Sequence, residues 1–397
     1  MRLWLFLSRF YLFNYMHIAW LGKKSPFCGN VTYGREITNA LLDRGHQVTF
    51  LHFAQPNSEE YSHPDRHEVS LPFFFKSQIL TLPSFRSGKL LVQALQRLKP
   101  DLVHASLTLS PLDFRLPEIC QSLDIPLVAT FHPPFDSKRR NLTSGTQHLT
   151  YQIYAPCLAH YDQVIVFSRL QQELLVKLGV PESRVAVISN GVDAQKYSPG
   201  PSTIKAELNA ERLFVYQGRL SIEKNVESLL RGWKHAKMGD RSRLVIVGSG
   251  PLQASLRAFY GSERNITWLG CVADEQRRIE ILRGADGFIL PSLVEGLSLS
   301  LLEGMACGAA CLATDAGADG EVLESGAGVI IDTQKVSTQL QALLPMLRDH
   351  PEMTALLGQK ARQRVLERYT LSKNISQLET LYARTAQLPR LYISQGA

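Results

Sequence analysis

Short apolar runs rich in β-branched residues alternate with amphipathic helical patterns along this chain of 397 residues, and the alternation restarts near its middle. This pattern predicts parallel sheets, because parallel strands need a crossover segment that is usually a helix. The strands expected in the first half are His17–Leu21, Gln47–His52, Leu102–Ala105, Pro126–Thr130 and Gln163–Phe167. Those expected in the second half are Arg212–Tyr216, Leu244–Gly248, Ile266–Leu269, Gly287–Leu290, Ala310–Thr314 and Gly328–Ile331. The predicted fold class is therefore α/β, with two Rossmann-like doubly wound domains facing an inter-domain cleft.

The segment Ser198–Pro201 is rich in proline and glycine and marks the predicted junction between the two halves. We expect an N-terminal domain over residues 16–197 and a C-terminal domain over residues 198–368. Residues 369–397 are expected to contain a helix that crosses back to the first domain.

Residues 1–15 are aromatic and apolar, with Arg2 and Arg9 interrupting them. A membrane-spanning helix needs roughly 20 residues, so this segment is too short to span. It also lacks the small-residue cleavage site of a secretory signal. It is either an interfacial amphipathic segment or an extension upstream of a true start at Met16. We favour the second interpretation, because Met16 directly precedes the first expected strand.

The composition is that of a globular protein, and the net charge of +7 lies mainly in the first half. A basic half suits an anionic membrane surface or a plain soluble protein of high pI. No nucleic-acid motif is recognisable, so we predict no nucleic-acid partner. The six cysteines form no C-x-x-C pair, which favours a reducing, cytoplasmic compartment. Neither a D-x-D motif nor a His/Asp cluster is visible, so we predict no metal site and no cofactor.

The segment Gly218–Asn225 follows the first expected strand of the second domain and opens a helix. Arg219 and Lys224 would both lie at the strand's carboxyl end, where ligands of such sheets bind. Two cations there can neutralise a diphosphate, Arg as a planar fork and Lys as a point charge. The alternative is a pair of ordinary surface cations, with Glu223 as an ion-pair partner.

Glu295 and Glu303 stand eight positions apart at the expected start of another helix of the same domain. Carboxylates at this place can accept hydrogen bonds from sugar hydroxyls, and helix N-terminal amides favour an anion. Glu303 has a competing structural role, since Ser300 and Glu303 match a capping box. Glu295 lies before the helix, where no capping role is evident.

Two further candidates lie in the first domain. Gly29 follows the first strand and precedes a helix, so the backbone there can approach a diphosphate, although a plain strand–helix turn explains it equally. His132 follows the strand that ends at Thr130, which places it at the sheet edge where ligands bind. The polar, basic segment Asp136–His148 is expected to be a mobile loop.

These residues resemble a known family. Glu295 to Glu303 is similar to the E-x7-E motif, and Gly218–Lys224 to the diphosphate-binding motif, of retaining glycosyltransferases of family 4, which have the GT-B fold. Ser189–Asp193 is also typical of that family, and the resemblance runs from about Met16 to about Tyr382. The segment Gly308–Ala310 departs from the usual G-x-P, and the proline often seen before Glu321 is missing.

The resemblance implies a role for each candidate. Arg219 and Lys224 would bind the donor's diphosphate, Glu295 the hydroxyls of the donor sugar and Glu303 the ribose. His132 would lie near the transferred sugar and, with Arg219, Lys224 and Glu295, make up the catalytic set. The other implied donor contacts are Gly29, Cys271, Val272, Gly296, Leu297 and Ser298.

The acceptor is predicted from a narrower resemblance. The stretches His17–Val48 and Phe131–Ser137 look like glycolipid-forming members such as bacterial digalactosyldiacylglycerol synthases. This implies transfer of a hexose from a UDP-sugar to a diacylglycerol-type lipid at the cytoplasmic face of a membrane. Leu71–Lys76 and Lys138–Arg140 would then touch an anionic membrane, unless they are a core strand and a solvated loop.

Two other functions are compatible with the same residues. The acceptor can be a soluble sugar or a polysaccharide precursor. Alternatively, the chain binds nucleotide-sugars without catalysis.

Overall fold

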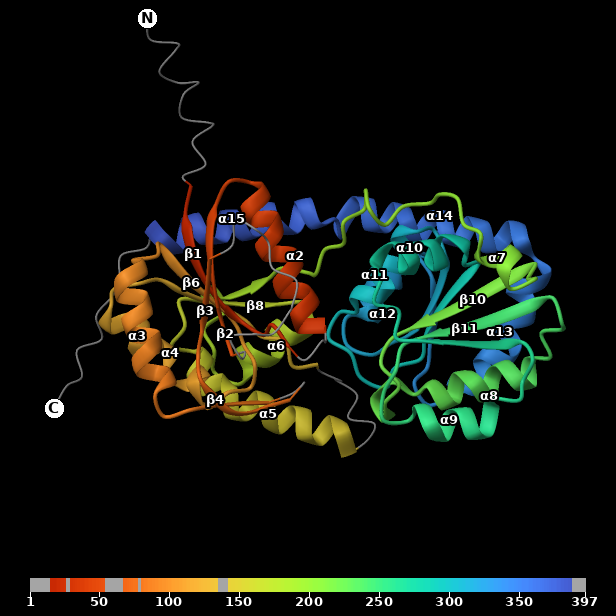
Figure 1. Cartoon of the computed structure of the whole chain (residues 1–397), viewed down its shortest axis with the longest axis horizontal. Coiled ribbons are helices and arrows are strands. Elements are labelled where there is room, and N and C mark those ends of the chain that lie inside the picture. The colour runs from red at the N-terminus through yellow and green to blue at the C-terminus, as the bar shows by residue number, and fades with distance from the viewer. Residues whose placement is uncertain (1–14, 26–28, 54–66, 78–79, 135–141, 388–397) are drawn as a thin grey trace, which may run out of the picture.

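The computed structural model describes residues 15–25, 29–53, 67–77, 80–134 and 142–387. It contains two parallel sheets with helices packed on both faces, one in each half of the chain (Figure 1). The α/β class and the doubly wound arrangement predicted from the alternating pattern are confirmed.

The first sheet has seven parallel strands in the order β3-β2-β1-β6-β7-β8-β9. Its strands are β1 (His17–Gly22), β2 (Gln47–His52), β3 (His67–Ser70), β6 (Leu102–Ser106), β7 (Leu127–Thr130), β8 (Gln163–Val166) and β9 (Val185–Val187). Every residue of β6, β7 and β8 is buried, as expected for central strands covered by helices on both faces. The helices of this half are α2 (Gly29–Asp43), α3 (Ser87–Leu98), α4 (Leu116–Ser122), α5 (Leu142–Leu158) and α6 (Arg169–Lys177), with 3₁₀ turns η1 (Pro111–Phe114) and η2 (Glu182–Arg184).

The second sheet has six parallel strands in the order β12-β11-β10-β13-β14-β15. They are β10 (Arg212–Gln217), β11 (Ser242–Val247), β12 (Ile266–Gly270), β13 (Gly287–Leu290), β14 (Ala310–Thr314) and β15 (Val329–Ile331). The helical segments before and between these strands are α7 (Ile204–Glu207), η3 (Ile222–Lys224), α8 (Val226–Ala236), α9 (Gln253–Tyr260), α10 (Glu275–Gly284), α11 (Leu299–Ala306) and α12 (Asp319–Leu323). The chain then continues through α13 (Val336–Asp349), α14 (Pro351–Arg368) and α15 (Leu371–Gln387).

Each sheet has one point where the strand order reverses. In the first sheet β1 lies between β2 and β6, and in the second β10 lies between β11 and β13. The loops leaving neighbouring strands diverge at such a point, so a ligand can lie between them at the carboxyl edge. Gly29 follows β1, and the charged candidates follow β10 and β13, so these residues lie where this rule places a site. His132 follows β7, one strand further from the reversal, and Cys271 and Val272 follow β12 at the edge of the second sheet.

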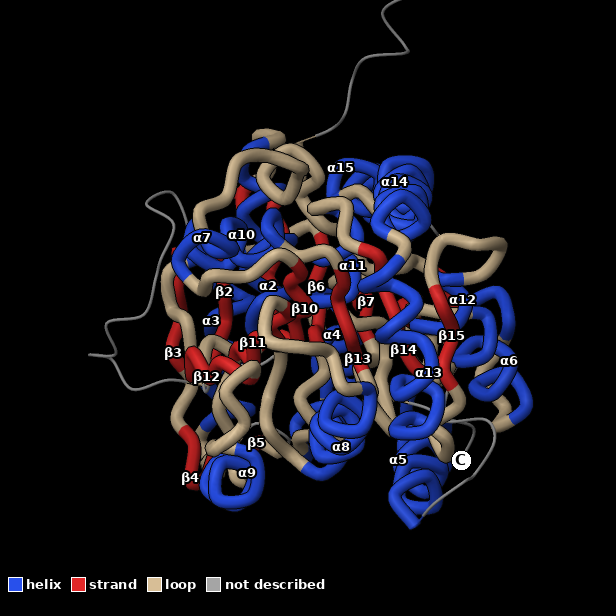
Figure 2. Tube along the Cα trace, turned by 90° about the vertical axis from the view of Figure 1, so that its right-hand side faces the viewer, coloured by secondary structure: helices blue, strands red, loops and turns tan. Residues whose placement is uncertain are grey.

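The C-terminal helix returns to the first domain. Figures 1 and 2 show α14 over the second domain and α15 beside it, continuing over the first. Glu379 of α15 is buried and accepts hydrogen bonds from Arg44 at 2.5 Å and from His46 at 3.1 Å. Further along, the Tyr382 hydroxyl lies 2.5 Å from His104 of β6. The predicted division between residues 197 and 198 stays a prediction.

One expectation about local structure needs correction, and one of the alternatives left open is excluded. Residues 142–148, expected to belong to a loop, form the first turns of α5, which is anchored by the buried rings of Tyr151 and Tyr154. The run Phe73–Lys76 is not a core strand but β4, which pairs antiparallel with β5 (Thr81–Pro83). Residues 1–14, 135–141 and with them Lys138–Arg140 lie outside the described ranges.

Candidate active site

Two neighbouring strands of the second sheet bring Lys224 and Glu295 together. Lys224 ends η3, just after β10, and Glu295 lies in the loop after β13. The Lys224 ammonium forms an ion pair with Glu295, whose carboxylate also accepts a hydrogen bond from Ser292 at 2.7 Å. Glu295 is 8% exposed, so its charge is compensated inside the protein rather than by bulk water.

The loops after β10 and β13 are also joined through the backbone. The amide of Leu293 donates to the carbonyl of Glu223 at 2.8 Å. The Glu223 carboxylate pairs with the guanidinium of Arg219 and accepts from the Ser221 hydroxyl at 2.7 Å. Arg219 is therefore in the ion pair with Glu223 that was considered as its alternative role. Burial works to raise the pKa of Glu223, but the hydrogen bond from Ser221 and the pairing with Arg219 outweigh it, so the pKa is lowered. Arg219 still keeps about a third of its side chain exposed at the sheet edge.

Glu303 does not cap its helix, contrary to the capping-box interpretation. The N-cap of α11 is Ser298, whose hydroxyl accepts from the amide of Leu301 at 3.4 Å. Glu303 lies inside the helix and accepts a hydrogen bond from the Gln217 side chain at 2.7 Å. Burial raises the pKa of Glu303 to about 7, and the nearby Arg278 opposes this rise. Gln217 was not predicted as a site residue. Its position at the carboxyl end of β10 could have indicated one, because ligands of such sheets bind there.

The loop Gly296–Ser298 is held from both domains. Its Leu297 carbonyl accepts from the Asn190 side chain at 2.8 Å, and its Gly296 carbonyl from the Ala318 amide at 2.8 Å. The Ser298 amide donates to the carboxylate of Asp319 at 2.9 Å. This amide, expected to face a sugar or phosphate, is therefore bonded within the protein.

Asp319 is a residue that the sequence analysis missed. It is 1% exposed, and burial together with the charge of Glu295 raises its pKa well above the usual range. The preceding Gly317 has φ of +58°, and a Cβ there would lie 2.0 Å from the Glu295 carbonyl oxygen. The signal available in the sequence was an acidic residue among the small residues of Ala316–Gly320.

His132 of the first domain lies opposite this loop. A Cβ added to Gly296 would lie 3.6 Å from the His132 carbonyl oxygen, so the two segments nearly touch. The Nε2 atom of His132 and the Ser106 hydroxyl form a hydrogen bond of 2.8 Å, and the His132 ring packs edge-on against Tyr33 at 5.0 Å between ring centroids. Burial, assisted by the charge of Lys23, lowers the pKa of His132 to about 3, so the ring is neutral at physiological pH.

The remaining predicted contacts lie around the charged residues without touching Lys224 or Glu295 in any hydrogen bond that the described residues show. Gly29 is exposed at the first turn of α2, with open space around it. Cys271 is exposed and Val272 half-buried, in a turn after β12 whose Val272 carbonyl is held by Arg278 at 2.9 Å. Arg278 also acts on Glu303 electrostatically, so this turn and Glu303 share a cation.

Among the described residues, no group of three or more His, Cys, Asp or Glu side chains is arranged to hold a metal ion.

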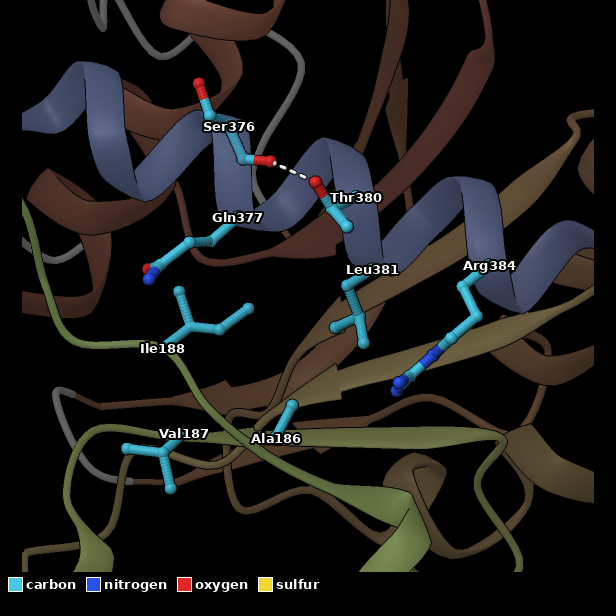
Figure 3. Close-up of a pocket in the computed structure, with 8 residues that line it drawn as sticks. All are labelled: Ala186, Val187, Ile188, Ser376, Gln377, Thr380, Leu381 and Arg384. Carbon is cyan, nitrogen blue, oxygen red and sulfur yellow. Dashed lines mark hydrogen bonds between the residues drawn. The ribbon is translucent and has the colours of Figure 1, made fainter.

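A cavity of about 410 Å³ lies away from these residues, between the end of β9 and α15 (Figure 3). It is lined by Ala186, Val187, Ile188, Ser376, Gln377, Thr380, Leu381 and Arg384. None of these is a predicted site residue, so this cavity is separate from the site.

None of the described helices combines the length and the apolar character that crossing a bilayer requires.

Two family models match the chain, one in each half. The model of Glycosyltransferase Family 4 matches residues 29–196, and that of Glycosyl transferases group 1 matches residues 203–364. The chain belongs to glycosyltransferase family 4. As a member of this family, it is a hexosyltransferase that takes its sugar from a nucleotide-sugar donor.

Individual relatives of this glycosyltransferase are distant but extend over much of its length. It is 23% identical over 372 residues to the N-acetyl-alpha-D-glucosaminyl L-malate synthase of Bacillus anthracis, covering 89% of this chain and 93% of the relative. It is 25% identical over 234 residues to the Escherichia coli UDP-Gal:alpha-D-GlcNAc-diphosphoundecaprenol alpha-1,3-galactosyltransferase, covering 55% and 59%. The solved structure of Anabaena HepE in complex with UDP and glucose superimposes with a TM-score of 0.73 at 18% identity, covering 93% of this chain and 100% of that chain. The last comparison supports the GT-B fold.

Proposed function

We propose that this glycosyltransferase moves a hexose from a UDP-sugar to a hydroxyl of a diacylglycerol-type glycolipid, with retention of configuration and without a metal ion or other cofactor. We place it at the cytoplasmic face of a membrane. The observation that carries the proposal is the ion pair of Lys224 and Glu295 at the strand-order reversal of the second sheet.

The charges at this edge suit departure of a diphosphate. When the bond between the sugar and the diphosphate breaks, negative charge grows on the leaving group and positive charge on the sugar. Lys224 and Arg219 would stabilise the leaving group, because fixed cations act without rearranging during the reaction. Their carboxylate partners Glu295 and Glu223 hold them in place before the donor binds.

Each remaining residue has a role in donor recognition. Glu295 would bind hydroxyls of the sugar, and Glu303, held by Gln217, those of the ribose. His132 is neutral, so its ring would orient a sugar hydroxyl by hydrogen bonding rather than by charge. Gly29 and the backbone of Gly296 and Leu297 would approach the diphosphate and sugar, with Cys271 and Val272 against the base.

The resemblance to retaining enzymes supplies the reaction course. The acceptor hydroxyl attacks from the face of the leaving group, the new glycosidic bond forms there, and a β-phosphate oxygen takes the proton. We assign the role of general base to none of the described residues at the site. His132 is a poor candidate, because a group whose pKa lies near 3 accepts a proton poorly at pH 7.

The acceptor is what most needs an experiment. The relatives' own acceptors differ, since one relative is named for L-malate and another for a diphosphoundecaprenol-linked sugar. A donor-by-acceptor screen would offer UDP-glucose, UDP-galactose and GDP-mannose with diacylglycerol vesicles or soluble sugars, and products would be read by mass spectrometry. Hexosylated lipid with a UDP-sugar supports the proposal. Products only from soluble acceptors would favour the soluble-acceptor function, and donor binding with no product in any combination would favour a non-catalytic binding protein.

A further inference from the structure

The β4–β5 hairpin carries an exposed aromatic cluster. Phe74 and Phe75 of β4 are 64% and 52% exposed, and Phe85, just after β5, is 94% exposed. The rings of Phe74 and Phe85 pack edge-on at 5.3 Å between centroids, while Leu82 pairs with Phe75 across the hairpin and is also exposed. Single exposed apolar residues are ordinary, but a contiguous group of this kind marks an interaction site.

Hydrogen bonds attach β4 to the domain near both of its ends. The Ser87 hydroxyl at the start of α3 donates to the carbonyl of Pro72 at 2.5 Å, which fixes the hairpin to that helix. Lys76 at the far end of β4 donates to the carbonyl of Phe53 at 2.6 Å. The aromatic side chains are therefore presented by an anchored element.

The charged residues of this stretch of the chain all have one sign. No Asp or Glu stands between Glu68 and Asp101 in the sequence. The same stretch contains five cations, of which all but Lys76 are exposed: Lys76, Arg86, Lys89, Arg97 and Lys99. A face that joins exposed phenylalanines to exposed cations, with no carboxylate within the stretch, is complementary to an anionic lipid surface.

We propose that β4, β5, Phe85 and the exposed cations Arg86 and Lys89 at the start of α3 form a docking surface for an anionic bilayer. Phenylalanine rings would enter the interface between headgroups and acyl chains, and Arg86 and Lys89 would lie among the lipid phosphates. This docking surface rests on the proposed function, because its role would be to hold the enzyme beside its lipid acceptor.

The positions of other elements agree with a molecule whose β4–β5 side faces the bilayer. In both Figure 1 and Figure 2 the hairpin and α5 lie at the lower side of the molecule, and α14 and α15 at the upper side. On α5, Leu149 and Ile153 are spaced one helical turn apart and both are more than half exposed. On α14, Leu356 and Leu366 are exposed and provide a matched control.

The test is flotation of the full chain with vesicles of phosphatidylcholine alone, or with phosphatidylglycerol added at about three parts in ten. One variant combines Phe74→Ser, Phe75→Ser and Phe85→Ser; a second combines Arg86→Glu and Lys89→Glu; the control combines Leu356→Ser and Leu366→Ser.

We expect the wild-type protein to bind the anionic vesicles and to be released from them by salt. Each basic residue near such a surface strengthens partitioning about fivefold, so charge reversal should lower it at least tenfold. The phenylalanine variant should lower it by a similar factor, and the control should bind like wild type.

Three results would contradict the proposed docking surface. In the first, wild type binds neutral and anionic vesicles equally or binds neither. In the second, both variants bind as well as wild type; in the third, wild type is a dimer that the phenylalanine variant converts to a monomer. The charge-reversal variant decides the matter if the phenylalanine variant does not fold. Transfer from UDP-hexose to a detergent-dispersed acceptor is measured on the same samples. Its persistence in variants that no longer float shows that the proposed function stands by itself, whereas its absence in wild type counts against the proposed function and not against the surface.

Discussion

Lys224 and Glu295 stand 71 positions apart in the chain, yet the ammonium of one is paired with the carboxylate of the other. The pair spans the loops that leave β10 and β13, the two strands where the order of the second sheet reverses. It places a cation, and a carboxylate already oriented by Ser292, at one sheet edge.

Replacing Lys224 by Ala should slow transfer. The cation that stabilises the leaving diphosphate is lost, and kcat should fall by on the order of 10²–10³, as when a preorganised donor is removed from other enzymes. Lys224→Arg should recover part of the rate, because its charge is kept but its geometry changes. The control is Arg231→Ala, which breaks the exposed pair of Arg231 with Glu227 on α8 and should leave kcat unchanged. Equal losses in Lys224→Ala and Arg231→Ala would contradict the role.

Glu303→Gln should remove a pH dependence of stability. The pKa of Glu303 is raised from 4.5 to about 7 in the folded protein, so between these values the folded state holds a proton that the unfolded state has released. Stability therefore falls as pH rises from 4.5 to about 7, by at most about 3 kcal/mol. Denaturant unfolding of both proteins from pH 4.5 to pH 8 measures this. The glutamine variant, whose side chain can still accept from Gln217, should gain stability relative to wild type as pH rises; parallel curves would show that Glu303 is ionised at neutral pH.

His132→Phe should keep the fold and reduce turnover. Phenylalanine preserves packing against Tyr33 and Phe167 but cannot bond to Ser106 or to a sugar hydroxyl. We expect kcat to fall about tenfold or more, in line with the loss of one or two hydrogen bonds at a buried site. Because the pKa of His132 is about 3, the pH–rate profile above pH 5 should keep its shape. A wild-type acidic limb near pH 6.5 that vanishes in the variant would contradict a permanently neutral ring.

Glu379→Ala should loosen the return of α15 to the first domain. The change deletes the acceptor shared by Arg44 and His46 and leaves the buried His46 ring with one partner fewer. We expect a loss of about 2 kcal/mol in unfolding free energy, with kcat little affected. Glu352→Ala is the control, because Glu352 is exposed on α14. If Glu379→Ala and Glu352→Ala unfold at the same denaturant concentration, the contact is not a structural tie.

The strands and the charged site residues could be predicted because both follow from local pattern. The strands Gln47–His52 and Ala310–Thr314 have the bounds that the alternating pattern predicted. Lys224 and Glu295 were recognisable because each follows a strand of the same parallel sheet, and such strands end at one edge. Neither inference needed knowledge of which side chains meet.

What the sequence did not reveal depends on contacts between distant segments. The bonds from Ser298 to Asp319 and from Gln217 to Glu303 depend on how elements far apart in the sequence are positioned relative to each other, which no local pattern encodes. A local pattern was also misleading at Ser300 and Glu303, because the backbone begins α11 one residue after Ser298 instead. The first turns of α5 look polar, but tertiary packing of Tyr151 and Tyr154 decides in favour of helix.

The most direct test of the central claim is the product formed by wild type and Glu295→Gln from UDP-hexose and diacylglycerol vesicles. UDP release would be followed with time, and the anomeric configuration of the purified lipid product would be read by NMR. Our account predicts hexosyl lipid with the donor's own anomeric configuration, formed one for one with UDP, and little product from the Glu295→Gln variant. An inverted product, or an undiminished rate in that variant, would contradict it.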